Sequence, residues 1–245
     1  MTIKTTAMGH LISLTGAVSV FCALSAGIAR ADQYPLTPES GVFAIVTGKE
    51  GLASGLAHRH IIVARQIQGT LTIEQAGGSD QALVKSGAAQ IEFRVEDLVV
   101  DKLEEAQRII PLLEAHKSWD SKVDELSPSN SDTVRENMLD SNQLNHTKFP
   151  TIKGVATFGD CKAAAADAAT CSMDLQLMIK GATVARKTNL TVSKSAGGLS
   201  GTFHLPLKFT DFGIKPYSAM MGAIKVKDDM IIAGQIRIQP AGRTK

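Results

Sequence analysis

Alternation of apolar and polar residues runs through most of this sequence, and it constrains the fold more than any other feature. From Gln90 to Val95, and again from Met173 to Lys180, every second residue is apolar and most of the others are polar or charged. Successive side chains of a strand point to opposite faces, so each segment predicts a strand with one apolar and one polar face. Further candidates are Val42–Thr47, His60–Glu74, Ile152–Phe158, Val184–Val192, Leu199–Leu207, Gly222–Val226 and Met230–Ile238.

Eight or nine such strands predict an all-β fold, because amphipathic strands bury their apolar faces in an antiparallel sheet that closes on itself or forms a sandwich. Between the last two candidates, Lys227-Asp228-Asp229 is interpreted as the turn of a hairpin. The strands leave little sequence for other secondary structure, apart from one segment.

The segment of about 102–144 carries a helical pattern instead. Leu103, Ile109 and Leu113 recur at helical spacing, and a second helix is predicted to begin near Asp132 as its N-cap. We interpret this segment as a short helical insertion between strands that lies over one end of the barrel. Trp119, within it, either caps a cavity or packs the insertion against the sheet.

Composition excludes several classes of protein. The chain has 245 residues, of which 44% are hydrophobic, with 26 basic and 24 acidic side chains. Disorder requires low hydrophobicity and high net charge, and nucleic-acid binding requires an excess of basic residues to neutralise phosphates. We therefore expect a globular protein with no nucleic-acid partner.

The first residues have the layout of a secretory signal. Lys4 precedes an apolar stretch, Leu11–Ile28, and small residues end the segment at Ala29-Arg30-Ala31. An uncleaved membrane anchor is the alternative, since the apolar stretch approaches the length of a membrane span. We expect residues 1–31 to be a cleaved signal peptide and 32–245 to be the exported domain.

Export affects the interpretation of the cysteines. The exported domain would keep Cys161 and Cys171, and an oxidising compartment commonly joins such a pair. Two free, buried thiols are the alternative. The two residues are not in a C-x-x-C motif, so a thioredoxin-type redox role has no support.

His58-Arg59-His60 is the best candidate for chemistry in the sequence. Residues two apart on a strand share a face, so His58 and His60 could bind one metal ion, or serve a hydrolase. No further ligand occurs at a recognisable spacing, and no nucleophile-elbow motif occurs. The alternative is that both imidazoles form local hydrogen bonds at the rim of a barrel, with no catalytic residue, metal or cofactor.

Several motifs resemble the YceI-like lipid/polyisoprenoid-binding proteins. They are most specific in the C-terminal half and preserve the family's order along the chain. The segments are Phe43-Ala44-Ile45, His60, Gly69-Thr70-Leu71, Phe149-Pro150-Thr151-Ile152, Leu177 to Thr183, Phe209-Thr210-Asp211-Phe212-Gly213-Ile214, Gly222 and Val226-Lys227-Asp228-Asp229.

The resemblance implies a lipocalin-like, eight-stranded antiparallel β-barrel in the bacterial periplasm that holds a polyisoprenoid or similar amphipathic lipid as a carrier or store. A barrel of eight strands is just wide enough for side chains or one slim ligand. A barrel filled by its own side chains, acting as an interaction module, is therefore a further alternative, and a homodimer is compatible with either. Strand parity gives the candidate ligand-binding residues Phe93, Val95, Leu175, Leu177, Ile179, Phe203, Phe209, Phe212, Ile236 and Ile238, with His58 and His60 at the headgroup.

Overall fold

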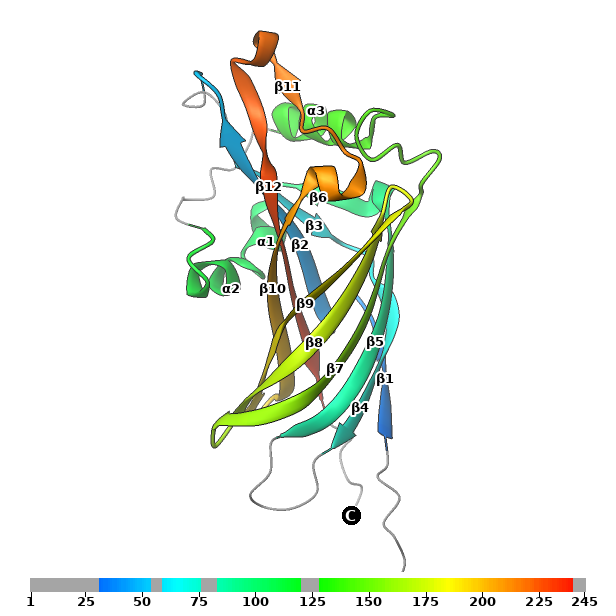
Figure 1. The fold of residues 1–245 in the computed structure, drawn as a ribbon, viewed down its shortest axis with the longest axis vertical. Helices are drawn as coiled ribbons and strands as arrows, with labels where there is room; N and C mark the ends of the chain where they lie inside the picture. The colour runs from blue at the N-terminus through cyan, green and yellow to red at the C-terminus, as the bar shows by residue number, and fades with distance from the viewer. Residues whose placement is uncertain (1–30, 54–58, 76–82, 120–127, 240–245) are drawn as a thin grey trace, which may run out of the picture.

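The computed structural model describes residues 31–53, 59–75, 83–119 and 128–239. Apart from Ala31, the predicted signal peptide lies outside these ranges, as do His58 and the end of the domain at 240–245. In the described part, long antiparallel strands form one curled sheet, and short helices lie at one end and on one flank (Figure 1). None of the described helices combines the length and hydropathy needed to span a membrane.

The chain forms these elements in the following order. The strands are β1 (Ala31–Leu36), β2 (Gly41–Glu50), β3 (Ile61–Ala64), β4 (Gln68–Gln75), β5 (Val84–Arg94), β6 (Leu98–Val100), β7 (Thr151–Ala165), β8 (Ala168–Ile179), β9 (Ala182–Ser195), β10 (Gly198–Lys208), β11 (Ser218–Ala219) and β12 (Ile224–Ile238). The helices are α1 (Leu103–Ala106), α2 (Ile110–Ala115) and α3 (Pro128–Leu139), with short 3-10 turns η2 (Val95–Asp97), η3 (Phe209–Phe212) and η4 (Met220–Gly222).

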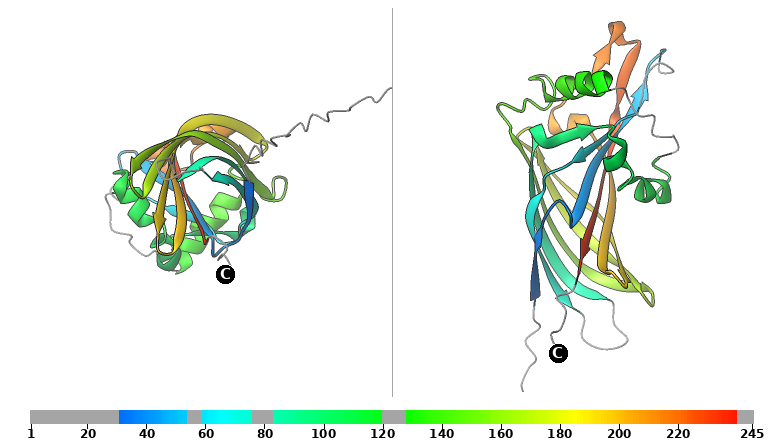
Figure 2. Two further views of the ribbon diagram at one scale, coloured as in Figure 1. Left: turned by 90° about the horizontal axis from the view of Figure 1, so that it is seen from below. Right: turned by 180° about the vertical axis from the view of Figure 1, so that it is seen from behind.

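The sheet is mostly a sequence of neighbouring hairpins. Its strand order is β1-β4-β5-β7-β8-β9-β10-β12-β2-β3-β6, with β11 paired to β12, and neighbouring strands in this order are antiparallel. Seen from below, the sheet curls around a central space (Figure 2). The all-β, lipocalin-like fold predicted from the alternation and the family resemblance is therefore confirmed.

The number and limits of the strands differ from the prediction of eight. The structure has twelve strands in its described part, several of them short. The predicted strand His60–Glu74 is divided into β3 and β4, which pair with different neighbours. The predicted hairpin turn at Lys227-Asp228-Asp229 is wrong, because these residues lie inside β12, where the pairing with β2 shifts register as at a bulge.

The disulfide pair joins two neighbouring strands. Cys161 of β7 and Cys171 of β8 are bonded, with their Cα atoms 4.0 Å apart. Cys161 lies where the β7–β8 pairing shifts register, and Cys171 is fully buried. The bond thus ties the far end of the longest hairpin, away from the helices (Figure 1).

The predicted insertion contains helices that cover two surfaces of the sheet. Ile109, Leu113 and Trp119 are buried in a small apolar cluster on the outer face of β2 and β3, so Trp119 packs the insertion against the sheet. The helix expected from Asp132 is present as α3 but begins at Pro128, so Asp132 lies inside the helix and is not its N-cap.

Helix α3 covers the edge strand of the sheet. The hydroxyl of Ser131, which is buried, donates a hydrogen bond of 2.7 Å to the carbonyl of Val100, and Arg135 Nε donates one of 3.0 Å to the carbonyl of Leu98. Both carbonyls belong to β6, the last strand in the order. These side chains satisfy carbonyl groups at a sheet edge and hold α3 across the end of the barrel (Figure 1).

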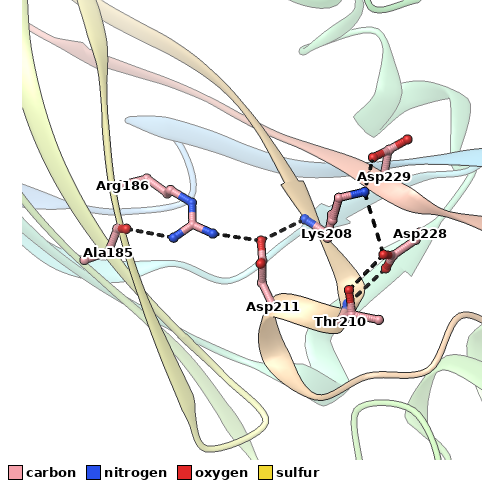
Figure 3. A network of polar contacts seen from close by, with 7 residues as sticks. All are labelled: Ala185, Arg186, Lys208, Thr210, Asp211, Asp228 and Asp229. Carbon is pink, nitrogen blue, oxygen red and sulfur yellow. Dashed lines mark hydrogen bonds and ion pairs between the residues drawn. The ribbon is translucent and has the colours of Figure 1, made fainter.

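The turn η3 is held by a polar network between three strands (Figure 3). Asp211 accepts a hydrogen bond of 3.1 Å from the backbone N–H of Lys208 and forms an ion pair of 3.1 Å with Arg186 of β9. Gly213, which ends η3, has a φ of 65°, a conformation that glycine adopts without strain. The Asp211-Phe212-Gly213 sequence therefore forms a hydrogen-bonded turn.

The bulge in β12 supplies the other half of this network (Figure 3). Asp228 accepts hydrogen bonds from the backbone N–H of Thr210 at 3.0 Å and from its hydroxyl at 2.8 Å. Asp229 pairs with Lys208 at 2.8 Å, and hydrogen bonds from Lys208 and Lys227 lower the pKa of this carboxyl to about 2. The acidic pair therefore secures η3 to β12.

Glycines inside the barrel provide a matched test of its packing. A Cβ on Gly234 would lie 2.4 Å from the Phe203 ring and 2.7 Å from the Phe43 ring, whereas one on Gly154 would meet only Leu177, at 3.5 Å. We expect Gly234→Ala to lower the free energy of unfolding by about 1–3 kcal/mol through overpacking. We expect Gly154→Ala to raise it by about 0.5–1 kcal/mol, because alanine costs less chain entropy. Denaturant unfolding of both variants measures this, and equal effects would contradict the packing described.

Candidate functional site

An apolar tunnel runs through the curled sheet. Its cavity volume is about 100 Å³, and every residue that lines it is apolar or glycine. On β7 the lining extends from Ile152 to Phe158, and on β8 from Met173 to Ile179. At about 3.3 Å per residue each of these runs covers about 20 Å, so the tunnel is long and narrow.

The alternation of each long strand explains this lining. The burial of β8 alternates between buried and less buried residues from Ala169 to Ile179, and its inward residues face the tunnel. At Gly234, the rings of Phe43 and Phe203 lie over a position without a side chain, with their centroids 6.2 Å apart. Gly234 therefore leaves room for the two phenylalanine rings, which narrow the tunnel at this point without filling it.

The structure brings most of the predicted ligand-binding residues to the tunnel. Those that line it are Phe93, Leu175, Leu177, Ile179, Phe203, Ile236 and Ile238. The other three do not line it. They were chosen by the alternation of strand residues, but they lie in 3-10 turns after the strands end, where side chains no longer alternate between two faces. Val95 lies in η2 and Phe212 in η3, both in the core, and Phe209 of η3 lines a second cavity.

The second cavity, which we call the vestibule, lies at the α3 end of the barrel. It has a volume of about 420 Å³ by the same measure and shares Ile62 with the tunnel lining. Its wall is mixed, with Asn130 and Asn137 of α3, Lys225 of β12 and His60 among the polar residues. An apolar tunnel that adjoins a vestibule of mixed polar and apolar lining matches an amphipathic ligand, whose chain and head need different surroundings.

His60 is held rigidly in the vestibule wall. Its Nδ1 lies 2.7 Å from Oδ2 of Asp101, while Oδ1 of Asp101 accepts a hydrogen bond of 2.7 Å from the N–H of Ile61. Its backbone N–H donates to the hydroxyl of Thr47, and its carbonyl accepts from the N–H of Thr47, both at 3.0 Å. Because the carboxylate oxygen accepts this hydrogen bond, Nδ1 is the donor and Nε2 is the ring nitrogen that the contact with Asp101 leaves available.

Asp101 is a functional candidate that the sequence did not reveal. Only 3% of its surface is exposed, and its φ is 48°, a conformation that aspartate tolerates better than most residues. It lies 41 residues from His60, and no local motif connects them. The two residues meet because β3 and β6 pair antiparallel, and His60 directly precedes β3 while Asp101 directly follows β6.

The predicted pairing of His58 with His60 is not described, because His58 lies outside the described residues. His60 itself precedes β3, and one of its ring nitrogens is occupied by Asp101. Among the described residues, no group of three or more His, Cys, Asp or Glu side chains is placed to hold a metal ion. His60 is therefore placed as a hydrogen-bonding residue of the vestibule.

A second histidine pair lies on the outer side of the barrel. His204 of β10 stacks on His116 of the insertion, with ring centroids 4.6 Å apart, and its Nε2 forms a hydrogen bond with Ser118. Arg59 lies over the Trp119 ring at 4.8 Å and also donates a hydrogen bond to the carbonyl of Ser118. These contacts fasten the insertion to the outside of the sheet and do not reach the tunnel lining.

Residues 53–238 match the model of the YceI-like domain family. The chain belongs to this family. No curated protein matches the sequence. Among solved structures, the crystal structure of Burkholderia cenocepacia BcnA is similar to this YceI-like protein, with 12% identity, a TM-score of 0.51, and coverage of 81% of this chain and 96% of that chain. At such identity the likeness shows the fold alone.

Two other solved structures have lower TM-scores. A polyisoprenoid binding domain from Saccharophagus degradans, implicated in plant cell wall breakdown, is 10% identical with a TM-score of 0.47, and covers 85% of this chain and 100% of that chain. The Campylobacter jejuni YCEI protein is 10% identical with a TM-score of 0.34, and covers 96% of this chain and 94% of that chain.

The tautomer of His60 in this YceI-like protein is open to a direct test. In the parent protein we expect the neutral ring to carry its proton on Nδ1. In Asp101→Asn the amide N–H₂ would face Nδ1, and the ring proton would then move to Nε2. Imidazole ¹⁵N chemical shifts measure the change, with circular dichroism to confirm folding. Absence of the Nδ1 proton in the parent protein would contradict the assigned hydrogen bond, because the carboxylate accepts that proton whether or not Nε2 is also protonated.

The outer histidine pair predicts a dependence of stability on pH. Burial, followed by the neighbouring His116, lowers the pKa of His204 below its ordinary value. The unfolded chain then binds the proton more readily, so stability is lost as the pH falls from about 6.5 through the folded pKa. We expect His204→Gln to lose less stability than the parent protein between pH 7 and pH 5. If the denaturation midpoints of the parent protein and the variant fell equally over this range, the lowered pKa of His204 would be contradicted.

Proposed function

We propose that this YceI-like protein binds an amphipathic lipid, with a polyisoprenoid or similar long chain in the tunnel and the polar head in the vestibule. The observation that carries the proposal is the lining of the tunnel, which consists of apolar residues and glycine along about 20 Å of strand. A lumen without polar groups offers no partner to a polar solute. It favours a hydrocarbon chain, with about 0.8 kcal/mol for each buried methylene.

The vestibule supports a ligand with a polar head. His60 lines the vestibule with its Nδ1 engaged by Asp101, and Asn130, Asn137 and Lys225 supply amide and ammonium groups to the same wall. These groups can accept and donate hydrogen bonds, so they suit a head that bears hydroxyl or other oxygen groups. Contacts between the vestibule and the head would select among lipids whose chains fit the tunnel equally well.

The proposal assigns binding, not catalysis, to the site. The ring of His60 hydrogen-bonds to a carboxylate, but the vestibule lining contains no serine or cysteine beside it in the described residues. Transport or storage of a water-insoluble molecule needs only the apolar enclosure. We propose that the protein is a carrier or store of its lipid.

We also propose that the protein acts in the periplasm after removal of residues 1–31. The cysteine pair, joined in the structure, supports an oxidising compartment. The predicted homodimer stays a prediction. Processing is checked by the N-terminal residue of the protein recovered from its host.

Native mass spectrometry of gently purified protein, followed by organic extraction, tests lipid binding. We expect a stoichiometric lipid in the parent protein and its loss in Leu177→Asp, because an unpaired charge in the tunnel opposes a hydrocarbon chain. Val155→Asp is the matched control, since Val155 lies on β7 and is 44% exposed.

A second variant keeps the test informative if Leu177→Asp fails to fold. Ala156→Leu keeps the tunnel apolar but fills part of it, so we expect the bound lipid to be shorter or absent while the circular dichroism spectrum is unchanged. A parent protein that never carries lipid, even after incubation with prenyl alcohols, would favour the barrel filled by its own side chains.

A further inference from the structure

The end of β2 and the turn between β11 and β12 form two tips that extend the barrel beyond the vestibule (Figure 1). Both carry exposed apolar side chains. Leu52 follows β2 and is fully exposed, at 102%. Met220 and Met221, in η4 between β11 and β12, are exposed at 66% and 108%. Exposed large apolar residues that lie together on a soluble surface commonly mark an interaction site.

The two tips form one rigid unit. The N–H of Ala53 donates a hydrogen bond of 2.9 Å to the carbonyl of Ala223, and Lys225 pairs with Glu50 in the ladder between β12 and β2. Gly51, with a φ of 104°, lies so close that a Cβ would be 2.5 Å from the Ala223 carbonyl oxygen. Leu52 lies between Gly51 and Ala53, so it stands next to the turn that carries the two methionines.

The backbone of the tip is strained where it presents its methionines. Met220 and Met221 have φ values of 50° and 53°, in the left-handed region that side chains other than those of glycine, asparagine and aspartate rarely adopt. Neither side chain gains compensating burial within the described protein, since both are exposed. Strain of this kind is typical of functional positions.

The tip adjoins the entrance of the proposed lipid site. Tyr217, just before β11, lines the vestibule, as do Ile224 and Lys225 at the start of β12. Lys49 and Lys225 lie on the adjoining ends of β2 and β12, in the ladder that leads to these apolar residues. Apolar side chains at an apex with lysines behind them are arranged as in interfacial anchors, where the cations lie at the level of the lipid headgroups.

We propose that Leu52, Met220 and Met221 insert into the surface of a lipid bilayer and so place the vestibule against the membrane. The tip projects from the barrel and is narrow, a shape that suits insertion between lipids. Docking here would let a lipid pass between the bilayer and the tunnel through the vestibule. This role rests on the proposed function, but insertion of the tip does not, because it is measured with vesicles irrespective of the contents of the tunnel.

Flotation of the purified full chain with vesicles tests the proposal. The probes are vesicles of phosphatidylcholine alone and of phosphatidylcholine with phosphatidylglycerol. We expect binding to both and tighter binding to the anionic vesicles, because of the lysines. We expect Leu52→Ser with Met221→Ser to reduce binding by about tenfold or more, as expected for two apolar side chains withdrawn from lipid. Val155→Ser, which removes an exposed apolar residue from the barrel wall, should leave binding unchanged.

Two further measurements separate the outcomes. Native mass spectrometry of the Leu52/Met221 variant should show the same lipid content as the parent protein, so a loss of vesicle binding cannot be ascribed to an empty or unfolded barrel. Absence of flotation with either vesicle would overturn the proposal, as would equal binding by the parent and the variant. Self-association that disappears in the variant, without vesicle binding, would overturn it in favour of an interface with a second copy.

Discussion

Burial of one apolar face along a continuous antiparallel ladder is the constraint on which the rest of the structure depends. The long strands from β5 to β12 carry runs of apolar residues at alternate positions, and these residues leave water together only if the sheet curls around them. The curl creates an interior lined solely by apolar side chains and glycine. The capacity for a hydrocarbon ligand is therefore a consequence of the same interaction that stabilises the fold.

The two ends of the barrel are built differently. At one end the disulfide ties β7 to β8, while at the other α3, η3 and the start of β12 line a vestibule whose wall mixes polar and apolar residues. The polar side chains there are ordered by local networks, such as Asp228 with Thr210 and Asp101 with His60. Selectivity for a head and access from a membrane would both be determined at this end, because the apolar tunnel itself discriminates poorly.

Much of this arrangement was predictable from the alternation. Leu175, Leu177 and Ile179 were assigned to the lumen by parity alone, and they line it. Parity failed for Val95 and Phe212, because each lies in a 3-10 turn, where the period of two no longer applies. The acidic pair before Met230 resembled a turn, but hydrogen bonds to η3 and to Lys208 favour a bulge within a longer strand.

By itself, the sequence determined the all-β class, the apolar character of the interior and the helical nature of the insertion, because these depend on local periodicity and composition. The resemblance of its motifs added the family. Only the tertiary structure decided which distant residues meet. The contact of His60 with Asp101, the stacking of His116 on His204, and the hydrogen bond of Ala53 to Ala223 each join segments far apart in the chain. They depend on strand pairing and helix docking, and local sequence patterns carry no record of such contacts.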